Sequence, residues 1–222
     1  MIRLQNLEKS VPAGQGRLWL LRQITLNIAA GEFVAITGPS GAGKSTLLSI
    51  LGLMDSDFSG NFELDGKPVH DLANKARQAL QREAIGFIFQ QYHLIDDLTV
   101  AENLDLPLSY RNVPSAERKA RVGDILDRFQ IVGKKDLYPK QLSGGQQQLV
   151  AVARATITRP KVLLADEPTG ALHTSQGEMI MDLLGELNRD GATIVMVTHS
   201  EANAARAQRR IALLDGWISE AR

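Results

Sequence analysis

The sequence of 222 residues contains no cysteine, and only 5% of its residues are aromatic. The absence of thiols excludes disulfide bonds and thiolate zinc sites, and it fits a reducing compartment. Basic and acidic residues balance at 25 each, so no basic field argues for nucleic acid as a partner. We find neither the apolar core of a signal peptide nor an apolar run long enough to span a bilayer. Any membrane part is therefore expected to come from another chain.

The order of apolar and polar residues predicts an α/β fold. In the last third, short and wholly apolar strands alternate with amphipathic helices, which is typical of a mostly parallel sheet covered on both faces. The first third is richer in strands, and Asp65-Gly66 is a hairpin signal, so we expect an N-terminal antiparallel β subdomain there. The predicted strands are 24–28, 33–37, 61–65, 85–89, 161–165, 193–198 and 211–214, and the predicted helices of the last third are 176–189 and about 200–207.

Between about 98 and 158 the pattern becomes helical. Val122, Ile125 and Leu126 belong to one apolar stripe with helical spacing. We therefore expect one domain over 1–222, in which 1–91 and 159–222 form the core with its β subdomain. Residues 92–158 are expected to form a helical subdomain.

A phosphate-binding loop is predicted between the strand 33–37 and the apolar run that follows it. The sequence GPSGAGKST matches G-x-x-x-x-G-K-[ST] in the required order of strand, loop and helix, and so predicts a P-loop NTPase core. Backbone N–H groups and a helix N-terminus would bind phosphate oxygens, Lys44 would place a charge near the outer phosphates, and Ser45 would offer a hydroxyl to Mg²⁺. The residues of this loop are Gly38, Pro39, Ser40, Gly41, Ala42, Gly43, Lys44, Ser45 and Thr46.

Two adjacent acids end the strand 161–165, at the edge of a parallel sheet where ligands bind. Asp166 is expected to hold Mg²⁺ directly or through water, and Glu167 to orient or deprotonate the attacking water. His199 ends the next apolar strand and is expected to hydrogen-bond the γ-phosphate. The alternatives are a strand-end cap for the acids and a structural role for the histidine.

These motifs, together with LSGGQQQ at 142–148, resemble the nucleotide-binding subunit of ABC transporters. IGFIFQQYHLI and ADEPTGAL are similar to the macrolide-export and lipoprotein-release ATPases (MacB and LolD type). The resemblance implies ATP and Mg²⁺ as cofactors and a head-to-tail dimer of two copies with composite sites. It implies Gln90, more than Gln91, as a ligand of Mg²⁺ or of the attacking water. From the opposing copy it implies contacts from Ser143, Gly144, Gly145 and Gln146.

The resemblance thus assigns Glu167, His199, Gln90 and Lys44 to catalysis, and Ser45, Gln90 and Asp166 to the metal. Three positions depart from the family pattern. His173 stands where an aspartate is usual, so it cannot supply a fixed carboxylate near pH 7. Val11 stands where an aromatic residue usually stacks on adenine, which predicts weaker ATP binding unless Trp19 substitutes. Leu149 replaces an arginine, and no consequence follows from the sequence.

The resemblance implies a subunit that powers a separate membrane permease from the cytoplasmic face of the inner membrane. It also implies export or extraction as the direction of transport. The sequence ends about where such a domain ends, so we expect the permease to be another chain. Residues 92–95 are expected either to bind that permease or to pack the helical subdomain. The alternative function is a regulatory or scaffolding ATPase with slow turnover, like the FtsE type. A DNA-repair or translation ATPase is disfavoured because the long coiled coil or second domain is absent and the charge is balanced.

Overall fold

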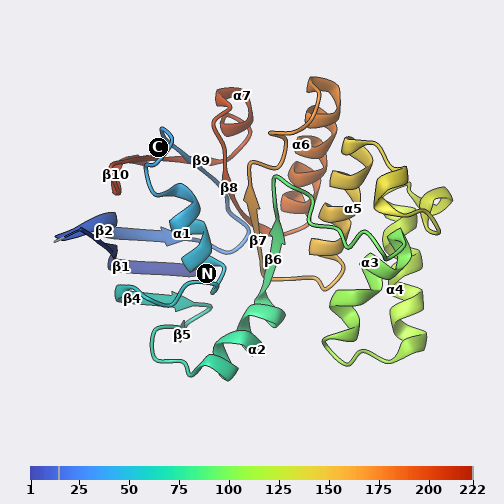
Figure 1. Ribbon diagram of the computed structural model, residues 1–222, viewed down its shortest axis with the longest axis horizontal. Helices are drawn as coiled ribbons and strands as arrows, with labels where there is room; N and C mark the ends of the chain where they lie inside the picture. Colours follow the sequence, from blue (N-terminus) through green and yellow to red (C-terminus); the bar gives the residue numbers. More distant parts are fainter. Residues whose placement is uncertain (15, 222) are drawn as a thin grey trace.

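The computed structural model describes residues 1–14 and 16–221, which form two sheets with helices around them. Figure 1 shows the smaller sheet at one end of the molecule and the helices α3, α4 and α5 at the other. The smaller, antiparallel sheet has the order β2-β1-β4-β5, and the larger has the order β10-β9-β3-β8-β7-β6. In the larger sheet β9, β3, β8, β7 and β6 run parallel, and only β10 is antiparallel. The predicted fold class is confirmed.

The strands of the smaller sheet are β1 (Ile2–Ala13), β2 (Gly16–Ile28), β4 (Ser59–Leu64) and β5 (Lys67–Pro68). Those of the larger sheet are β3 (Phe33–Thr37), β6 (Ile85–Ile88), β7 (Val162–Asp166), β8 (Thr193–Val197), β9 (Arg209–Leu214) and β10 (Trp217–Ala221). The α-helices are α1 (Lys44–Leu51), α2 (Asn74–Ala84), α3 (Val100–Ser109), α4 (Ser115–Arg128), α5 (Gly144–Thr156), α6 (Thr174–Arg189) and α7 (Glu201–Ala204). Short 3₁₀ helices span Val132–Lys134 and Pro139–Gln141.

The large sheet is buried on both faces, as its continuous apolar strands predict. Every residue of β3 and β8 is buried. Successive side chains point to opposite faces, so Val34 and Ile36 pack with α1 and the small sheet, while Phe33 and Ala35 pack with the helical side. The apolar side chains of α3, α4, α5 and α6 belong to one cluster with that second face. The helical region is therefore anchored to the sheet by a shared core.

The long strand β1, the helix α2 and the strand β10 were not predicted. Irregular pairing accounts for β1, because its register with β2 shifts between Leu4 and Leu7 and again around Lys9. Asn6 has a positive φ of 48° inside this strand, so the apolar residues do not alternate regularly along it. The regular alternation of apolar and polar residues consequently marks only the last part of β2, residues 24–28.

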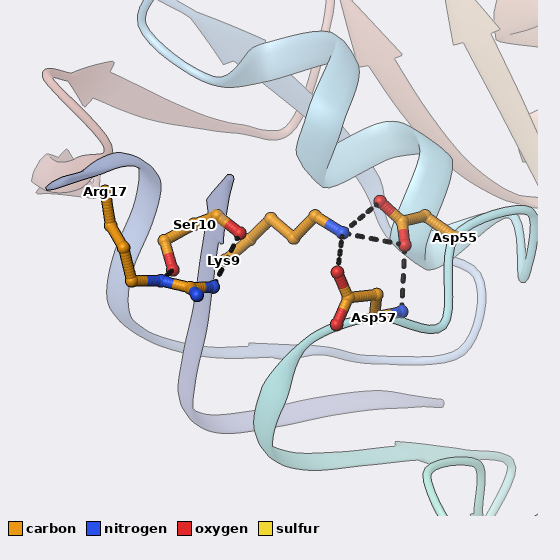
Figure 2. Close-up of polar contacts among 5 residues, drawn as sticks. All are labelled: Lys9, Ser10, Arg17, Asp55 and Asp57. Atoms are coloured by element: carbon orange, nitrogen blue, oxygen red, sulfur yellow. Dashed lines mark hydrogen bonds and ion pairs between the residues drawn. The ribbon is translucent and has the colours of Figure 1, made fainter. Parts of the chain in front are cut away.

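Lys9 fastens the N-terminal hairpin to the segment that follows α1 (Figure 2). Its Nζ donates to Oδ1 of Asp55 at 3.1 Å and to Oδ2 of Asp57 at 3.1 Å. The Lys9 side chain is only 8% exposed, whereas Asp57 is 89% exposed. Arg17 lies on β2, and its Nε donates to Oγ of Ser10 on β1 at 2.7 Å, which ties the two strands of the hairpin together. The hairpin is thus held both internally and against the segment after the phosphate-loop helix.

We expect Lys9→Met to destabilise the fold by about 1–3 kcal/mol. The substitution keeps the buried stem but removes the ammonium group, which leaves Asp55 and Asp57 as neighbouring like charges. The urea midpoint of unfolding measures this change. Lys67→Met, at an exposed lysine of the same sheet, should stay within about 0.5 kcal/mol of the wild type. Equal midpoints for the two variants would contradict the anchoring role.

Candidate functional site

A pocket of about 670 Å³ lies at the carboxyl end of the parallel strands. It is lined by residues of the phosphate loop, of the ends of β7 and β8 and of the segment after β6. This is the edge of a parallel sheet at which ligands are expected to bind. Most of the predicted catalytic, metal and phosphate-binding residues line this one pocket. Its lining consists of Leu20, Ser40, Gly41, Gly43, Lys44, Ser45, Thr46, Gln90, Asp166, Glu167, Gly170, Val197 and His199.

The phosphate loop is wound tightly around the Lys44 side chain. Lys44 Nζ donates to the carbonyls of Gly38 at 2.8 Å and Pro39 at 2.7 Å, and burial lowers the pKa of this ammonium group. Gly43 precedes α1 with φ 100°, and a Cβ on it would lie 2.4 Å from the Leu20 carbonyl oxygen. Only glycine fits this position. The loop therefore surrounds a space with backbone amides and one lysine.

The paired acids sit where two parallel strands end. Glu167 has a positive φ of 45°, and its backbone N–H donates to the Val197 carbonyl at 3.0 Å, so the chain turns sharply after β7. His199 Nε2 lies 3.3 Å from Glu167 Oε1. That oxygen is buried and accepts no hydrogen bond from the described residues. An unsatisfied buried carboxylate oxygen is well placed to accept from a water molecule in the pocket.

Burial raises the pKa of both Asp166 and Glu167. For Asp166 this effect is opposed by Lys44, by a hydrogen bond from Ser45 and by His199. For Glu167 it is opposed first by His199 and reinforced by Asp166. The two carboxylates are thus held in a setting that a bound cation would stabilise.

The donor set in the pocket fits Mg²⁺. Ser45, Gln90 and Asp166 offer hydroxyl, amide and carboxylate oxygens, the hard ligands that this ion prefers. Across 1–14 and 16–221 no three His, Cys, Asp or Glu side chains form a metal-binding group. An ion held by one carboxylate and the phosphates of a nucleotide does not require such a group.

Several predicted residues lie outside the pocket. The loop residues Gly38, Pro39 and Ala42 do not line it. Ser143, Gly144, Gly145 and Gln146 lie at the N-terminus of α5, where Ser143 Oγ accepts from the Gln146 N–H at 3.4 Å. The α5 N-terminus is packed closely, since a Cβ on Gly144 would lie 2.7 Å from the Tyr92 hydroxyl. Within one chain these residues therefore do not contribute to the site.

Val11 also lies outside the pocket, on the hairpin of β1 and β2. It pairs with Leu18, whereas Trp19 pairs with Ser10, so Val11 and Trp19 are on opposite faces of the hairpin. Trp19 is consequently not placed to substitute for an aromatic residue at position 11. Leu18, which is 54% exposed, shares the face of Val11 instead.

Leu20 is a pocket residue that sequence reasoning missed. Lys9 pairs with Leu21 and Ser10 with Trp19, which leaves Leu20 unpaired in a β-bulge. The bulge brings the Leu20 carbonyl against the phosphate loop, and its side chain lines the pocket. No local sequence signal marks such a bulge.

The segment 92–95 mostly packs within the helical region. The Tyr92 hydroxyl lies against Gly144, and the His93 ring lies 4.6 Å from the Phe89 ring. Leu94 packs against the apolar cluster that the helices form with the large sheet. Ile95 is 41% exposed. These contacts favour the packing interpretation for the first three residues.

We expect Asp166→Asn to stabilise the nucleotide-free chain. Because the folded pKa of Asp166 is raised above its unfolded value, ionisation opposes folding, and wild-type stability rises as the pH falls toward that pKa. Asparagine carries no such ionisation cost, so the melting temperature of the variant should be higher at neutral pH. The difference should shrink as the pH is lowered toward the raised pKa of Asp166. About 1 kcal/mol corresponds to roughly 2–4 °C in a chain of this size. Thermal melting with EDTA measures the effect. Asp96→Asn, at an exposed loop position, should show no such pH-dependent difference.

The glycine-rich loop, the lysine inside it and the acids at the neighbouring strand end define a P-loop nucleotide-binding protein. Residues 21–170 match the model of the family described as ABC transporter. The chain therefore belongs to the ABC transporter family, as an ATP-binding cassette. Over the part of the chain described, no helix is long and apolar enough to cross a bilayer.

Relatives and solved structures agree with this assignment. The macrolide export ATP-binding/permease protein MacB 1/2 of Paracoccus denitrificans is 45% identical over 98% of this chain and 33% of its own length. MacB of Sodalis glossinidius has the same identity and coverage. The chain thus spans about a third of the curated relatives it matches. The dimeric cassette MJ0796 bound to ADP and Pi is 41% identical, with a TM-score of 0.92, covering 100% of this chain and 98% of that one.

Proposed function

We propose that this chain binds and hydrolyses ATP to power a membrane permease of the MacB and LolD type. The observation that carries the proposal is the single pocket shared by Lys44, Asp166, Glu167 and His199. Such a pocket combines anion binding, metal binding and activation of water, the three requirements of ATP hydrolysis. The permease belongs to the proposal because the MacB relatives are ATP-binding/permease proteins.

The polar residues of the pocket divide the tasks of hydrolysis among them. The loop amides and Lys44 bind and orient the outer phosphates, and they stabilise the charge that develops during phosphoryl transfer. Ser45, Asp166 and Gln90 would hold Mg²⁺, which neutralises phosphate charge when bound. Glu167 orients the attacking water and accepts its proton, and His199 binds the γ-phosphate beside it.

We also propose that two copies form a head-to-tail dimer with ATP between them. The N-terminus of α5, from Ser143 to Gln146, is outside the pocket of its own chain and is suited to bind the anion of a second copy. MJ0796, with closely similar structure, is dimeric. Residues 92–158 would act as the helical subdomain of this cassette, and 1–91 with 159–222 as its core. Its place would be the cytoplasmic face of the inner membrane, beside the permease.

The test is ATP hydrolysis by the purified chain as a function of protein concentration, with Glu167→Gln as the blank. A rate that rises faster than linearly and vanishes in the blank supports a dimeric ATPase. The same assay with His173→Asp shows whether His173 restrains turnover. A rate of ATP hydrolysis that does not change when a reconstituted permease and its cargo are added would instead favour the regulatory alternative. The proposal would be rejected if neither the wild type nor His173→Asp hydrolysed ATP faster than the blank, with or without the permease.

We expect Val11→Tyr to strengthen ATP binding. An aromatic ring on the hairpin can stack on adenine, whereas Val11 and Leu18 offer only small aliphatic contacts, and stacking contributes about 1–3 kcal/mol per base. This range corresponds to a gain in affinity of about five- to 140-fold, which equilibrium binding of a fluorescent ATP analogue measures. Ser10→Tyr places the ring on the other face of the hairpin and should give no gain. Unchanged affinity of Val11→Tyr would refute the role of position 11.

A further inference from the structure

One glutamine of α5 is fully buried but has no part in the nucleotide pocket. Gln148 ends the motif at 142–148, and the residue is 0% exposed. The helix α5 packs against α3, α6 and β6 (Figure 1). Glutamine is mostly an exposed residue, so its complete burial on a motif helix indicates a specific polar contact.

The side-chain amide of Gln148 joins two segments that are far apart in the sequence. Its Nε2 donates to the Pro168 carbonyl at 2.6 Å and to the Phe89 carbonyl at 3.4 Å. Pro168 directly follows Glu167 in the chain. Phe89 directly precedes Gln90. One amide group, with its two donor hydrogens, therefore connects the segment of the candidate general base to that of a candidate metal ligand.

The turn after Glu167 begins with an unfavourable backbone conformation. Glu167 has a φ of 45°, a region that residues with a side chain rarely adopt. Its carbonyl accepts from the Gly170 N–H at 3.0 Å, which closes a tight turn. A Cβ on Gly170 would lie 2.9 Å from Nε2 of Gln90, so this turn lies against Gln90. The position of the Glu167 carboxylate thus depends on the contacts that hold this turn in place.

Other side chains hold only one of the two segments. Arg154, also on α5, donates to two carbonyls of the segment 89–93 at 2.6 and 3.0 Å. Asn203 donates through Nδ2 to a hydroxyl of the segment 166–170 at 2.8 Å. Gln148 reaches both segments. Its removal would leave each segment held, but it would no longer fix the one relative to the other.

The oxygen of the Gln148 amide has no partner in the part of the chain described. Oε1 is buried and accepts no hydrogen bond from those residues. An unpaired buried oxygen lowers the stability of the folded chain, and an apolar side chain of the same size would avoid that cost. Stability therefore does not account for a glutamine at this position, whereas a need for its two donor hydrogens does.

We infer that Gln148 is a positioning residue for ATP hydrolysis. Through one carbonyl of each, it holds the segments 89–93 and 166–170 at a fixed separation, and so places the carboxylate of Glu167 for its action on the attacking water. The inference rests on the proposed function, because it takes Glu167 as the group that activates the water. Gln148 does not line the nucleotide pocket, so it acts through these segments and not on the nucleotide. A misplacement of about 1 Å at a reacting group can lower the rate by about a hundredfold.

Gln148→Met tests this role, because methionine keeps the length of the side chain and removes both donors. The single-turnover rate constant of ATP hydrolysis should fall by about ten- to a hundredfold. The affinity for ATP, measured with a fluorescent analogue, should stay within about threefold of wild type, because the phosphate loop is unchanged. A general loss of structure would not separate rate from affinity in this way. The melting temperature should stay close to that of wild type, because the unpaired oxygen is removed together with the donors.

Thr156→Val is the matched control on the same helix. Thr156 is also buried, and its Oγ1 donates to the carbonyls of Val152 at 3.0 Å and Ala153 at 3.1 Å, away from the nucleotide pocket. This variant likewise removes a buried side-chain donor from two backbone carbonyls, but it should hydrolyse ATP at the wild-type rate. Gln148→Leu is a second variant without donors and should behave like Gln148→Met.

An unchanged rate constant in Gln148→Met would overturn the inference, because the bridge between the two segments would then not be needed. An equal loss of rate in Thr156→Val, or a loss of ATP affinity in step with the rate, would also overturn it by showing a general structural effect. Failure of both Gln148 variants to fold would mean that the glutamine serves the fold itself, and would reject the positioning role.

Glu167→Gln in the same assay separates this inference from the proposed function. A large loss of rate in Glu167→Gln, together with a normal rate in Gln148→Met, rejects the positioning role and leaves the ATPase intact. A wild-type rate in Glu167→Gln, or no hydrolysis by the wild type with or without the permease, rejects the proposed function itself.

Discussion

Glu167→Gln is expected to lower the rate of ATP hydrolysis by roughly a hundred- to ten-thousand-fold, the usual range for loss of a general base. Glutamine fills the same space, but it cannot accept the proton of the attacking water. Glu167 Oε1 is the atom concerned, since it is buried in the pocket, accepts no hydrogen bond among the described residues and lies 3.3 Å from His199 Nε2. Single-turnover hydrolysis measures the effect without interference from product release.

ATP binding should survive this substitution. The variant removes a negative charge whose ionisation burial opposes, so the affinity for an anionic nucleotide should stay equal or rise. Glu178→Gln, an exposed glutamate on α6, is the matched control and should hydrolyse ATP at the wild-type rate. A Glu167→Gln rate within tenfold of the wild type would show that another group activates the water. Loss of ATP binding would instead reveal a structural role for Glu167.

The regular part of the fold could be predicted from the sequence because burial on both faces leaves a simple pattern. The strand predicted at 33–37 coincides with β3, and 193–198 differs from β8 by one residue. Helix 176–189 is α6 begun two residues late. The hairpin of β1 and β2 could not be predicted in full because bulges and a residue with positive φ disrupt the alternation that would mark it.

The site divides in the same way. Residues carried by a contiguous motif, such as Lys44 and Ser45, or placed at strand ends, such as Asp166 and His199, were predicted and meet in one pocket. Leu20 was missed because a bulge brings it there. Sequence patterns thus predict those site residues that a contiguous motif or a strand end places. Residues that reach the site only through tertiary packing cannot be predicted in this way.

Lys44→Ala is expected to weaken ATP binding by roughly a hundredfold, as for loss of one partner of a desolvated charge pair. Lys44 carries the positive charge of the phosphate loop, and its Nζ is already held at the loop centre by the carbonyls of Gly38 and Pro39. Little conformational entropy is lost when this ammonium binds a phosphate, which makes the interaction strong. Isothermal titration with ATP and Mg²⁺ measures the loss, and hydrolysis should fall with it.

Binding of adenosine distinguishes the phosphate contribution of Lys44 from the contribution of the rest of the site. Because adenosine carries no phosphate, its affinity should be the same for Lys44→Ala and wild type, whereas the affinities for ADP and ATP should fall. Lys75→Ala, at an exposed lysine of α2, should change none of them. An ATP affinity within about threefold of wild type would mean that the loop amides alone bind the phosphates.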